Sequence, residues 1–399
     1  MQRSSIIPGY NGLRAIACLA VFAVHLQQLT LSTGKPSIRG RTGPIDWGRL
    51  AENGNTGVCL FFMLSGFLLS LPLGHAPAIS GIDRATRGSR WLFGFALRRI
   101  ARILPAYYLC LTALILMGKA AGTNDIILHY LLLHNFTEAT LYSINDPFWT
   151  IAVQAQFYIV FAFLMLPLAP LARHKGIIAL LLMVCIVATF LIHSYIITSA
   201  STGALNSRVS QSVLRVSMLA HLPHFLLGML AALAFAAMNK PAASERFSDD
   251  DAKQPSIGFD FFVLLCAVAI LAILAVPSLD ELFRLPVRSS ESRMVGRYNF
   301  PYVPLLIAII LVLLPRTKLL VGLMELAPIR FLGVISYGIY VFHLPCLELC
   351  KKLLTGNRQN AQVNTITLAL LGLGASIIVA SISFFAVERP LMRWSKRGA

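Results

Sequence analysis

Residues 10–31 read YNGLRAIACLAVFAVHLQQLTL, and this apolar stretch decides how the chain folds. Its length is close to the ~20 residues that an α-helix needs to cross a bilayer. Two ionisable residues, Arg14 and His25, interrupt it. At ~100° per residue the interval between them is about three full turns, so both side chains share one helix face, about 16 Å apart along the axis. Because an ionisable group at membrane depth is costly, the pair indicates a functional site.

The composition extends this interpretation to the whole chain. Of its 399 residues, 57% are hydrophobic and 13% are charged, whereas a soluble domain has about 25% charged residues. The net charge of +17 is spread over short loops between apolar runs. That distribution is typical of a polytopic membrane protein in contact with anionic lipid, and it excludes nucleic acid as a partner. The seven cysteines form no C-x-x-C pair, so we expect buried thiols and no metal site.

Apolar runs along the chain predict an all-α, polytopic transmembrane helix bundle of about ten spans. The runs lie at 10–31, 54–73, 103–120, 148–170, 176–199, 213–238, 258–277, 300–315, 329–350 and 362–387. The shorter run 126–136 is interpreted as interfacial or re-entrant. Basic residues, densest between Arg84 and Arg102, favour cytoplasmic termini. We expect one integral membrane domain over 1–399, a flexible cytoplasmic loop at 239–257 and no fused esterase domain.

Three arginines, Arg98, Arg99 and Arg102, directly precede the third predicted span. Arg99 and Arg102 are three residues apart, so they point the same way on a helix. Guanidinium groups one turn apart suit a phosphate or diphosphate, because each can donate to two oxygens. The alternative is a basic anchor at the cytoplasmic end of a helix, and the residues alone leave both open.

Other polar side chains inside the apolar runs are candidates for a site. His25 is a candidate general base, because an imidazole can accept a proton near neutrality, or it is hydrogen-bonded to a neighbouring helix. Gln154 and Tyr158 share a face at i, i+4, where they serve either inter-helix bonding or substrate binding. Further candidates for a substrate cavity are Trp149, Ser65, Tyr340 and His343. For Ser65, which precedes Gly66, close helix packing is the favoured alternative.

Together these segments resemble the acyltransferase-3 family of integral membrane acyltransferases, in order and spacing over nearly the whole chain. Each motif alone is weak, but six in order are specific. The motifs are Gly12-Leu13-Arg14-Ala15 with His25, Gly57-Val58 to Leu64-Ser65-Gly66-Phe67, Arg98-Arg99-x-x-Arg102-x-x-Pro105-x-Tyr107-Tyr108, Trp149 to Phe157-Tyr158, Ser336-Tyr337-x-x-Tyr340-x-x-His343-x-Pro345, and Glu388-Arg389-Pro390.

The resemblance implies an enzyme that takes an acyl group, usually acetyl, from cytoplasmic acyl-CoA and passes it to a hydroxyl. The acceptor is often a sugar of a polysaccharide, a glycolipid or an antibiotic. His25 would be the catalytic residue with Arg14 supporting it, and Arg99 and Arg102, next to Arg98, would hold the CoA phosphates. The resemblance implies acetyl-CoA as co-substrate, no metal, and a bacterial inner (cytoplasmic) membrane location.

Two positions depart from the family pattern. Asn11 and Gln154 stand where the family often has carboxylates, and an amide can hydrogen-bond but cannot balance an arginine or act as a base. Without a fused esterase domain, the chain would act on a small or lipid-linked acceptor or pass its acyl group to a separate extracytoplasmic protein. The alternative functions are a transporter or flippase of a lipid-linked sugar or acyl donor, and an inactive scaffold. Transporters often have matching halves and intramembrane carboxylates, and we find neither in this sequence.

Overall fold

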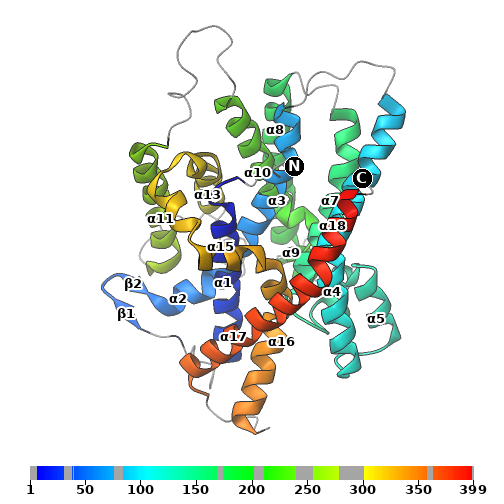
Figure 1. Ribbon diagram of the computed structural model, residues 1–399, viewed down its shortest axis with the longest axis vertical. Helices are drawn as coiled ribbons and strands as arrows, with labels where there is room; N and C mark the ends of the chain where they lie inside the picture. Colours follow the sequence, from blue (N-terminus) through cyan, green and yellow to red (C-terminus); the bar gives the residue numbers. More distant parts are fainter. Residues whose placement is uncertain are drawn as a thin grey trace. The chain divides into compact units, whose positions relative to one another are not determined.

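The chain folds almost entirely into α-helices (Figure 1). The computed structural model describes residues 7–30, 38, 40–75, 84–168, 174–201, 211–239, 255–277, 301–356 and 363–397. Within these ranges, strand structure is confined to a short antiparallel pair, β1 (Arg41–Thr42) and β2 (Ile45–Asp46). The all-α prediction is therefore confirmed.

Seven helical stretches of the described chain are long and apolar enough to cross a membrane. They involve α1 (Tyr10–Leu29), α2 (Trp47–Glu52) running through η1 (Asn53–Asn55) into α3 (Thr56–His75), α4 (Arg84–Leu116), α8 (Lys175–Ser201), α10 (Met218–Met238), α11 (Ile257–Ala275) and α17 (Thr365–Ser383). The bent pair α15 (Ala327–Val334) and α16 (Ser336–Thr355) forms an eighth candidate span if the two helices are taken as one. Two further helices, α7 (Phe148–Leu168) and α13 (Tyr302–Leu313), are apolar but shorter over their described parts. Each predicted span thus contains a helix, while the number that cross and the side of the termini stay predictions.

The remaining elements are short. They are α5 (Thr123–Tyr130), η3 (His134–Phe136), α6 (Glu138–Leu141), α9 (Gln211–Arg215), η7 (Leu314–Arg316), α14 (Leu319–Met324), η8 (Phe384–Glu388), a π-helical turn, and α18 (Arg389–Arg397). The apolar run 126–136 is divided between α5 and η3, and neither is long enough to cross a bilayer. Of the predicted loop at 239–257, residues 240–254 lie outside the described residues.

One predicted boundary is wrong. We expected the third span to begin near residue 103, with the arginines before it, but α4 is a continuous helix from Arg84 to Leu116. The apolar part of this helix already begins at Phe93. Arg98, Arg99 and Arg102 therefore lie in the interior of a helix rather than before its first residue.

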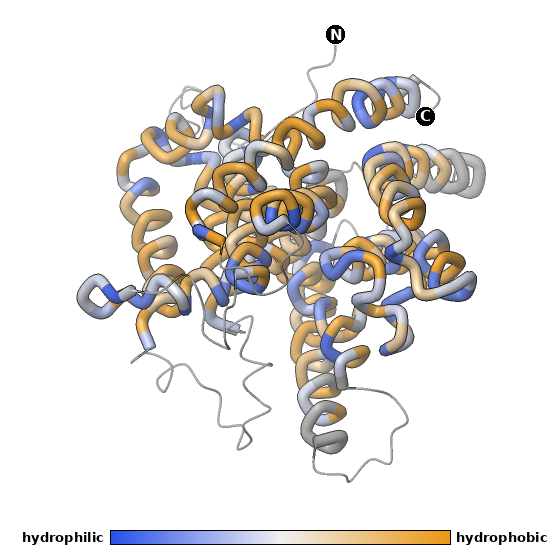
Figure 2. Tube along the Cα trace, turned by 90° about the horizontal axis from the view of Figure 1, so that it is seen from below, coloured by the Kyte–Doolittle hydropathy of each residue, from blue (hydrophilic) through white to orange (hydrophobic). Residues whose placement is uncertain are grey.

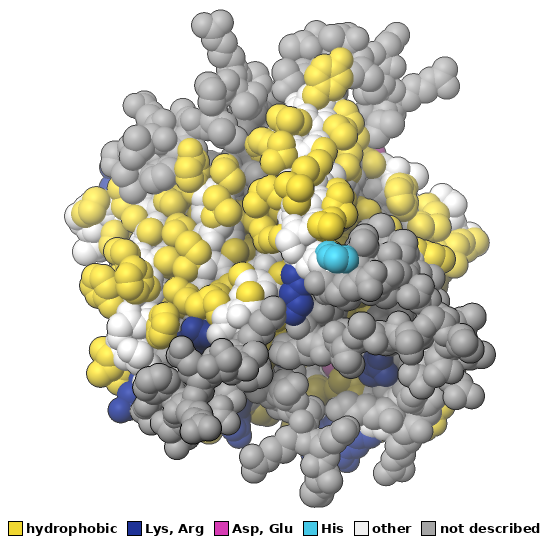
Figure 3. All heavy atoms as spheres, turned by 90° about the horizontal axis from the view of Figure 1, so that it is seen from above, with side chains coloured by type: hydrophobic (Ala, Val, Ile, Leu, Met, Phe, Trp, Pro, Cys, Tyr) yellow, Lys and Arg dark blue, Asp and Glu magenta, His cyan; other side chains and the backbone are white. Residues whose placement is uncertain are grey.

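Several long helices expose apolar side chains rather than bury them. Only a small share of the apolar stretches of α8, α11 and α17 is buried inside the protein. Figure 2 shows long hydrophobic stretches along the helices, and Figure 3 shows hydrophobic side chains gathered over the described part of one face. Large exposed apolar surfaces are unfavourable in water, so they indicate contact with lipid.

The chain divides into two compact units, which are described separately. The first contains residues 1–75, 179–186 and 224–334. In it α1 packs against α3 and α15, and glycines permit the close approach. A Cβ at Gly57 would collide with the carbonyl of Ala17, and a Cβ at Gly333 would collide with the backbone of Asn11. Gly66 likewise packs against the Phe225 backbone on α10, so this glycine is used for helix packing.

The second unit contains residues 76–178, 187–223 and 335–399. In it α4 packs against α7, α16, α18 and η8, and α16 packs along α17. The short elements α5, η3 and α6 adjoin α4 and α7. This unit holds the arginines of α4 and most of the other predicted site residues.

Candidate active site

His25 of the first unit is a buried imidazole in α1 with a defined hydrogen-bonding state. Its Nδ1 lies 3.0 Å from the carbonyl oxygen of Val21, one turn earlier. A carbonyl oxygen can only accept, so Nδ1 carries the hydrogen and donates it. In the neutral ring Nε2 therefore has the lone pair, which is the arrangement that a general base requires.

Arg14 lies on the same helix, nearer to its start. Its Nη1 donates to the Oδ1 of Asn11 at 3.1 Å, and Asn11 is itself buried. The amide therefore orients the guanidinium, although it brings no negative charge to it. Asn11, at a position where the family often has a carboxylate, thus still hydrogen-bonds Arg14.

Arg99 of the second unit lies against two aromatic rings. Its Cζ is 5.5 Å from the centroid of the Phe95 ring on α4 and 5.5 Å from that of Tyr158 on α7. The two rings meet edge to face, with centroids 6.4 Å apart and planes at 86°. Each ring face attracts a cation, which partly offsets the cost of removing the guanidinium from water. We call Phe95, Arg99 and Tyr158 the arginine clamp.

The arginine clamp supplies no negative charge. Within the described part of the chain, Arg99 forms no hydrogen bond or ion pair, and its buried Nε has no partner. The nearest charged neighbours that act on it are two other cations, Arg98 and Arg102. Buried donors in proteins nearly always have an acceptor, and arginine cannot lose its proton to avoid the need. The buried Nε of Arg99 thus keeps a hydrogen for which the described residues offer no acceptor.

Two neighbours complete the surroundings of the clamp. The amide Nε2 of Gln154 donates to the hydroxyl oxygen of Tyr158 at 2.7 Å, so the predicted i, i+4 pair is a direct contact. On the next turn of α4, Arg102 acts electrostatically on Glu388, a buried carboxylate in η8 that also accepts from Ser383 at 2.9 Å. Arg102 thus has an acidic neighbour that Arg99 lacks.

The other predicted site residues lie at separate places. In the second unit, the Tyr340 hydroxyl is 2.6 Å from that of Thr150, and the Nδ1 of His343 donates to the Tyr340 carbonyl at 2.7 Å. The Trp149 ring contacts the ring of His221, with centroids 5.1 Å apart. Ser65 is half-buried in α3 of the first unit. The structure therefore joins Gln154 and Tyr158 to Arg99, and Tyr340 to His343.

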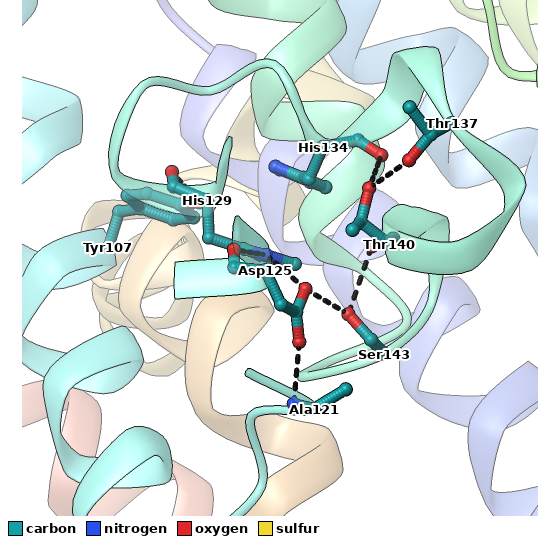
Figure 4. A network of polar contacts seen from close by, with 8 residues as sticks. All are labelled: Tyr107, Ala121, Asp125, His129, His134, Thr137, Thr140 and Ser143. Atoms are coloured by element: carbon teal, nitrogen blue, oxygen red, sulfur yellow. Dashed lines mark hydrogen bonds and ion pairs between the residues drawn. The ribbon is translucent and has the colours of Figure 1, made fainter. Parts of the chain in front are cut away.

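Sequence analysis missed a polar cluster between α5 and α6, drawn in Figure 4. The rings of His129 and His134 stack, with centroids 4.0 Å apart and planes at 5°. Asp125 holds His129 through an Oδ1–Nδ1 contact of 3.1 Å, and it also accepts from Ser143 Oγ at 2.7 Å and from the Ala121 N–H at 2.9 Å. We call Asp125, His129 and His134 the histidine cluster. The histidines in the run IILHYLLLHNF were its sequence signal.

The histidine cluster is closed and kept neutral. Both rings are fully buried, and three of their nitrogens, His129 Nε2 and both of His134, form no well-aligned hydrogen bond among the described residues, although the Phe148 backbone lies near His134. Burial lowers the pKa of His129, and burial together with the neighbouring His129 lowers the pKa of His134 to about 3. Between the rings Leu132 has φ 58°, a left-handed conformation that costs a residue with a Cβ about 1 kcal/mol or more.

A metal centre finds no support in the described residues, where no three His, Cys, Asp or Glu side chains lie as a metal ion would need them. The fold and these side chains define an integral membrane protein that holds an arginine beside aromatic rings in one unit and a buried histidine in the other.

Comparison with known proteins identifies the class. The family described as an acyltransferase domain matches residues 7–385, so this chain belongs to that family. The peptidoglycan O-acetyltransferase OatA of Listeria monocytogenes is 24% identical over 97% of the chain and 56% of its own length. YrhL of Bacillus subtilis, provisionally named as a peptidoglycan O-acetyltransferase, is 24% identical over 98% of the chain and 55% of its own length. The chain thus spans about half the length of these relatives, and no solved structure matches it.

Proposed function

We propose that this chain is a membrane O-acetyltransferase that moves an acetyl group from cytoplasmic acetyl-CoA to a hydroxyl of a carbohydrate or lipid-linked acceptor. Family membership and the names of the relatives support acyl transfer and a sugar acceptor. The observation that carries the donor assignment is Arg99, a guanidinium in the apolar part of α4 with no acceptor among the described residues. CoA ends in phosphates, and phosphate oxygens are the acceptors that a guanidinium fork fits best.

The proposed chemistry assigns separate tasks to the two units. Arg99, with Arg98 and Arg102, binds the charged end of acetyl-CoA, and His25 is the base for the reaction of its thioester. The Nε2 of His25 takes the proton from the acceptor hydroxyl while that oxygen attacks the thioester carbonyl. The C–S bond then breaks, and the proton passes from His25 to the sulfur of CoA. Arg14, about 16 Å away along the same helix face, is too distant to contact the reacting carbonyl and supports His25 only indirectly.

A covalent route uses the same residues. His25 Nε2 could attack the thioester first, form an acyl-imidazole with release of CoA, and then yield the acetyl group to the acceptor hydroxyl. Both routes need the lone pair on Nε2, which the hydrogen bond from Nδ1 to Val21 provides. Trapping of labelled enzyme in the absence of acceptor separates the two.

The test uses purified protein in nanodiscs with radiolabelled acetyl-CoA and membranes or sugar acceptors. We expect His25→Ala and His25→Gln to bind acetyl-CoA normally and to lose transfer by about 100-fold or more. His174→Gln, on a residue at the start of α8 and outside the proposed machinery, is the control. Full transfer by a folded His25→Ala protein would contradict the assignment. Binding without CoA release by the wild-type protein would instead favour the transporter alternative.

A further inference from the structure

Two hydrogen-bond donors converge in the arginine clamp. Tyr158 accepts from Gln154 through its hydroxyl oxygen, at 2.7 Å. A hydroxyl that accepts in this way keeps its own hydrogen for another acceptor. Within the described part of the chain that hydrogen has no acceptor, and the same ring lies over the guanidinium of Arg99, which also has none.

We propose that the Tyr158 hydroxyl is a second ligand of the acyl-CoA phosphate that Arg99 binds, and that Gln154 keeps this hydroxyl available. The inference rests on the proposed function, because it assigns a further ligand to the same donor site. The bound group is a phosphate ester, to whose oxygens the guanidinium of Arg99 and the hydroxyl of Tyr158 both donate.

The surroundings of Tyr158 hold its hydroxyl in position. The ring is 9% exposed and contacts Phe157, with centroids 6.3 Å apart. Phe161 stacks on Phe95 at 5.7 Å and lies 5.9 Å from Phe157, so the second ring of the clamp is fixed by the same aromatic cluster. Donors whose orientation is already fixed lose little entropy when a ligand binds, and this raises affinity.

The identity of residue 154 determines where the Tyr158 hydrogen points. A glutamine donates to Tyr158 and leaves the hydrogen for the phosphate. A glutamate has only acceptor oxygens, so it would take that hydrogen and add a negative charge beside the anion site. Gln154 thus acts as a positioning residue through Tyr158. Gln154→Glu should weaken the binding of acetyl-CoA and leave transfer at saturating acetyl-CoA intact.

The experiment measures the acetyl-CoA dissociation constant of the full chain in phosphatidylcholine nanodiscs. We expect Tyr158→Phe, which keeps the ring over Arg99 and removes the hydroxyl, to weaken binding about tenfold, the loss of one hydrogen bond to a charged group. Gln154→Glu should weaken it by a similar factor and raise KM with little change in kcat. Tyr142→Phe, on an exposed tyrosine of the same unit, should match the wild type.

The outcomes separate this inference from the function it rests on. If wild-type protein binds no acetyl-CoA, the proposed function fails. If the wild type binds and Arg99→Gln does not, but Tyr158→Phe and Gln154→Glu bind like Tyr142→Phe, only the role of Tyr158 is overturned. A second series in phosphatidylglycerol nanodiscs tests the other source of phosphate. If Tyr158→Phe alters the retention of phosphatidylglycerol and leaves acetyl-CoA binding unchanged, the ligand is a lipid headgroup and the inference is wrong.

Discussion

The arginine clamp and the histidine cluster, both in the second unit, remove basic side chains from water in opposite ways. Arg99 stays charged, so two aromatic rings lie against it and its buried Nε keeps its hydrogen without an acceptor among the described residues. His129 and His134 can lose their charge, so they stack as neutral rings that Asp125 and a strained turn hold in place. A charged arginine with an unpartnered donor suits a ligand, whereas a pair of stacked, neutral histidines suits a structural role. Burial of a basic group alone therefore does not mark a binding site.

Substitution of Arg99 should weaken acetyl-CoA binding far more than substitution of His134. Arg99→Gln should weaken acetyl-CoA binding by roughly 100-fold, because it removes two charge-assisted hydrogen bonds. His134→Phe, which keeps a flat ring against His129, should leave binding unchanged. Equilibrium binding of radiolabelled acetyl-CoA to each variant checks both. Equal losses in the two variants would mean that the clamp has no special role in recognition.

The pH dependence of stability should come from the histidine cluster. The folded-state pKa of His134, about 3, is below its unfolded value of about 6.5. The unfolded chain therefore binds more protons between these values, and stability falls as the pH drops below 6.5. From pH 7 to pH 5 we expect a loss of about 2 kcal/mol from His134, and His129 acts in the same direction. Melting temperatures measured across this range check the sign.

His134→Phe sharpens this prediction. Phenylalanine cannot gain a proton and removes two unpartnered nitrogens, so the decline between pH 7 and pH 5 should become shallower. At pH 5 the variant should melt at a higher temperature than the wild type. An unchanged pH profile would place the titrating group elsewhere.

A small gain in stability is expected from a substitution in the turn between His129 and His134. Leu132→Gly should remove the strain of the left-handed conformation and stabilise the fold by about 1 kcal/mol, less whatever its side-chain contacts contribute. Leu131→Gly, at the preceding residue of the same turn, is the matched control and should stabilise nothing. Thermal melts at pH 7 are sufficient, and destabilisation by Leu132→Gly would show that the Leu132 side chain outweighs its backbone strain.

The sequence predicted the helices well because apolar runs of span length have few alternatives in lipid. The start of α4 was missed because residues 84–102 are rich in arginine and lack a continuous apolar run. The pairing of Gln154 with Tyr158 followed from helical spacing. The contact between Arg99 and Tyr158 could not be predicted, since it joins two helices far apart in sequence.

The histidine cluster escaped prediction for a different reason. His129 and His134 stack because the chain reverses at Leu132, and leucine carries no signal for a left-handed turn. The catalytic role of His25 and the ligand role of the arginines remain predictions, since they depend on a substrate as well as on the fold.

The central claim is that Arg99 holds a phosphate of acyl-CoA inside the clamp, and an experimental structure of the full chain with bound acetyl-CoA tests it most directly. In that structure we expect a phosphate oxygen about 3 Å from a guanidinium nitrogen of Arg99. Acetyl-CoA bound with all of its phosphates away from Arg99, and the clamp unchanged, would contradict it.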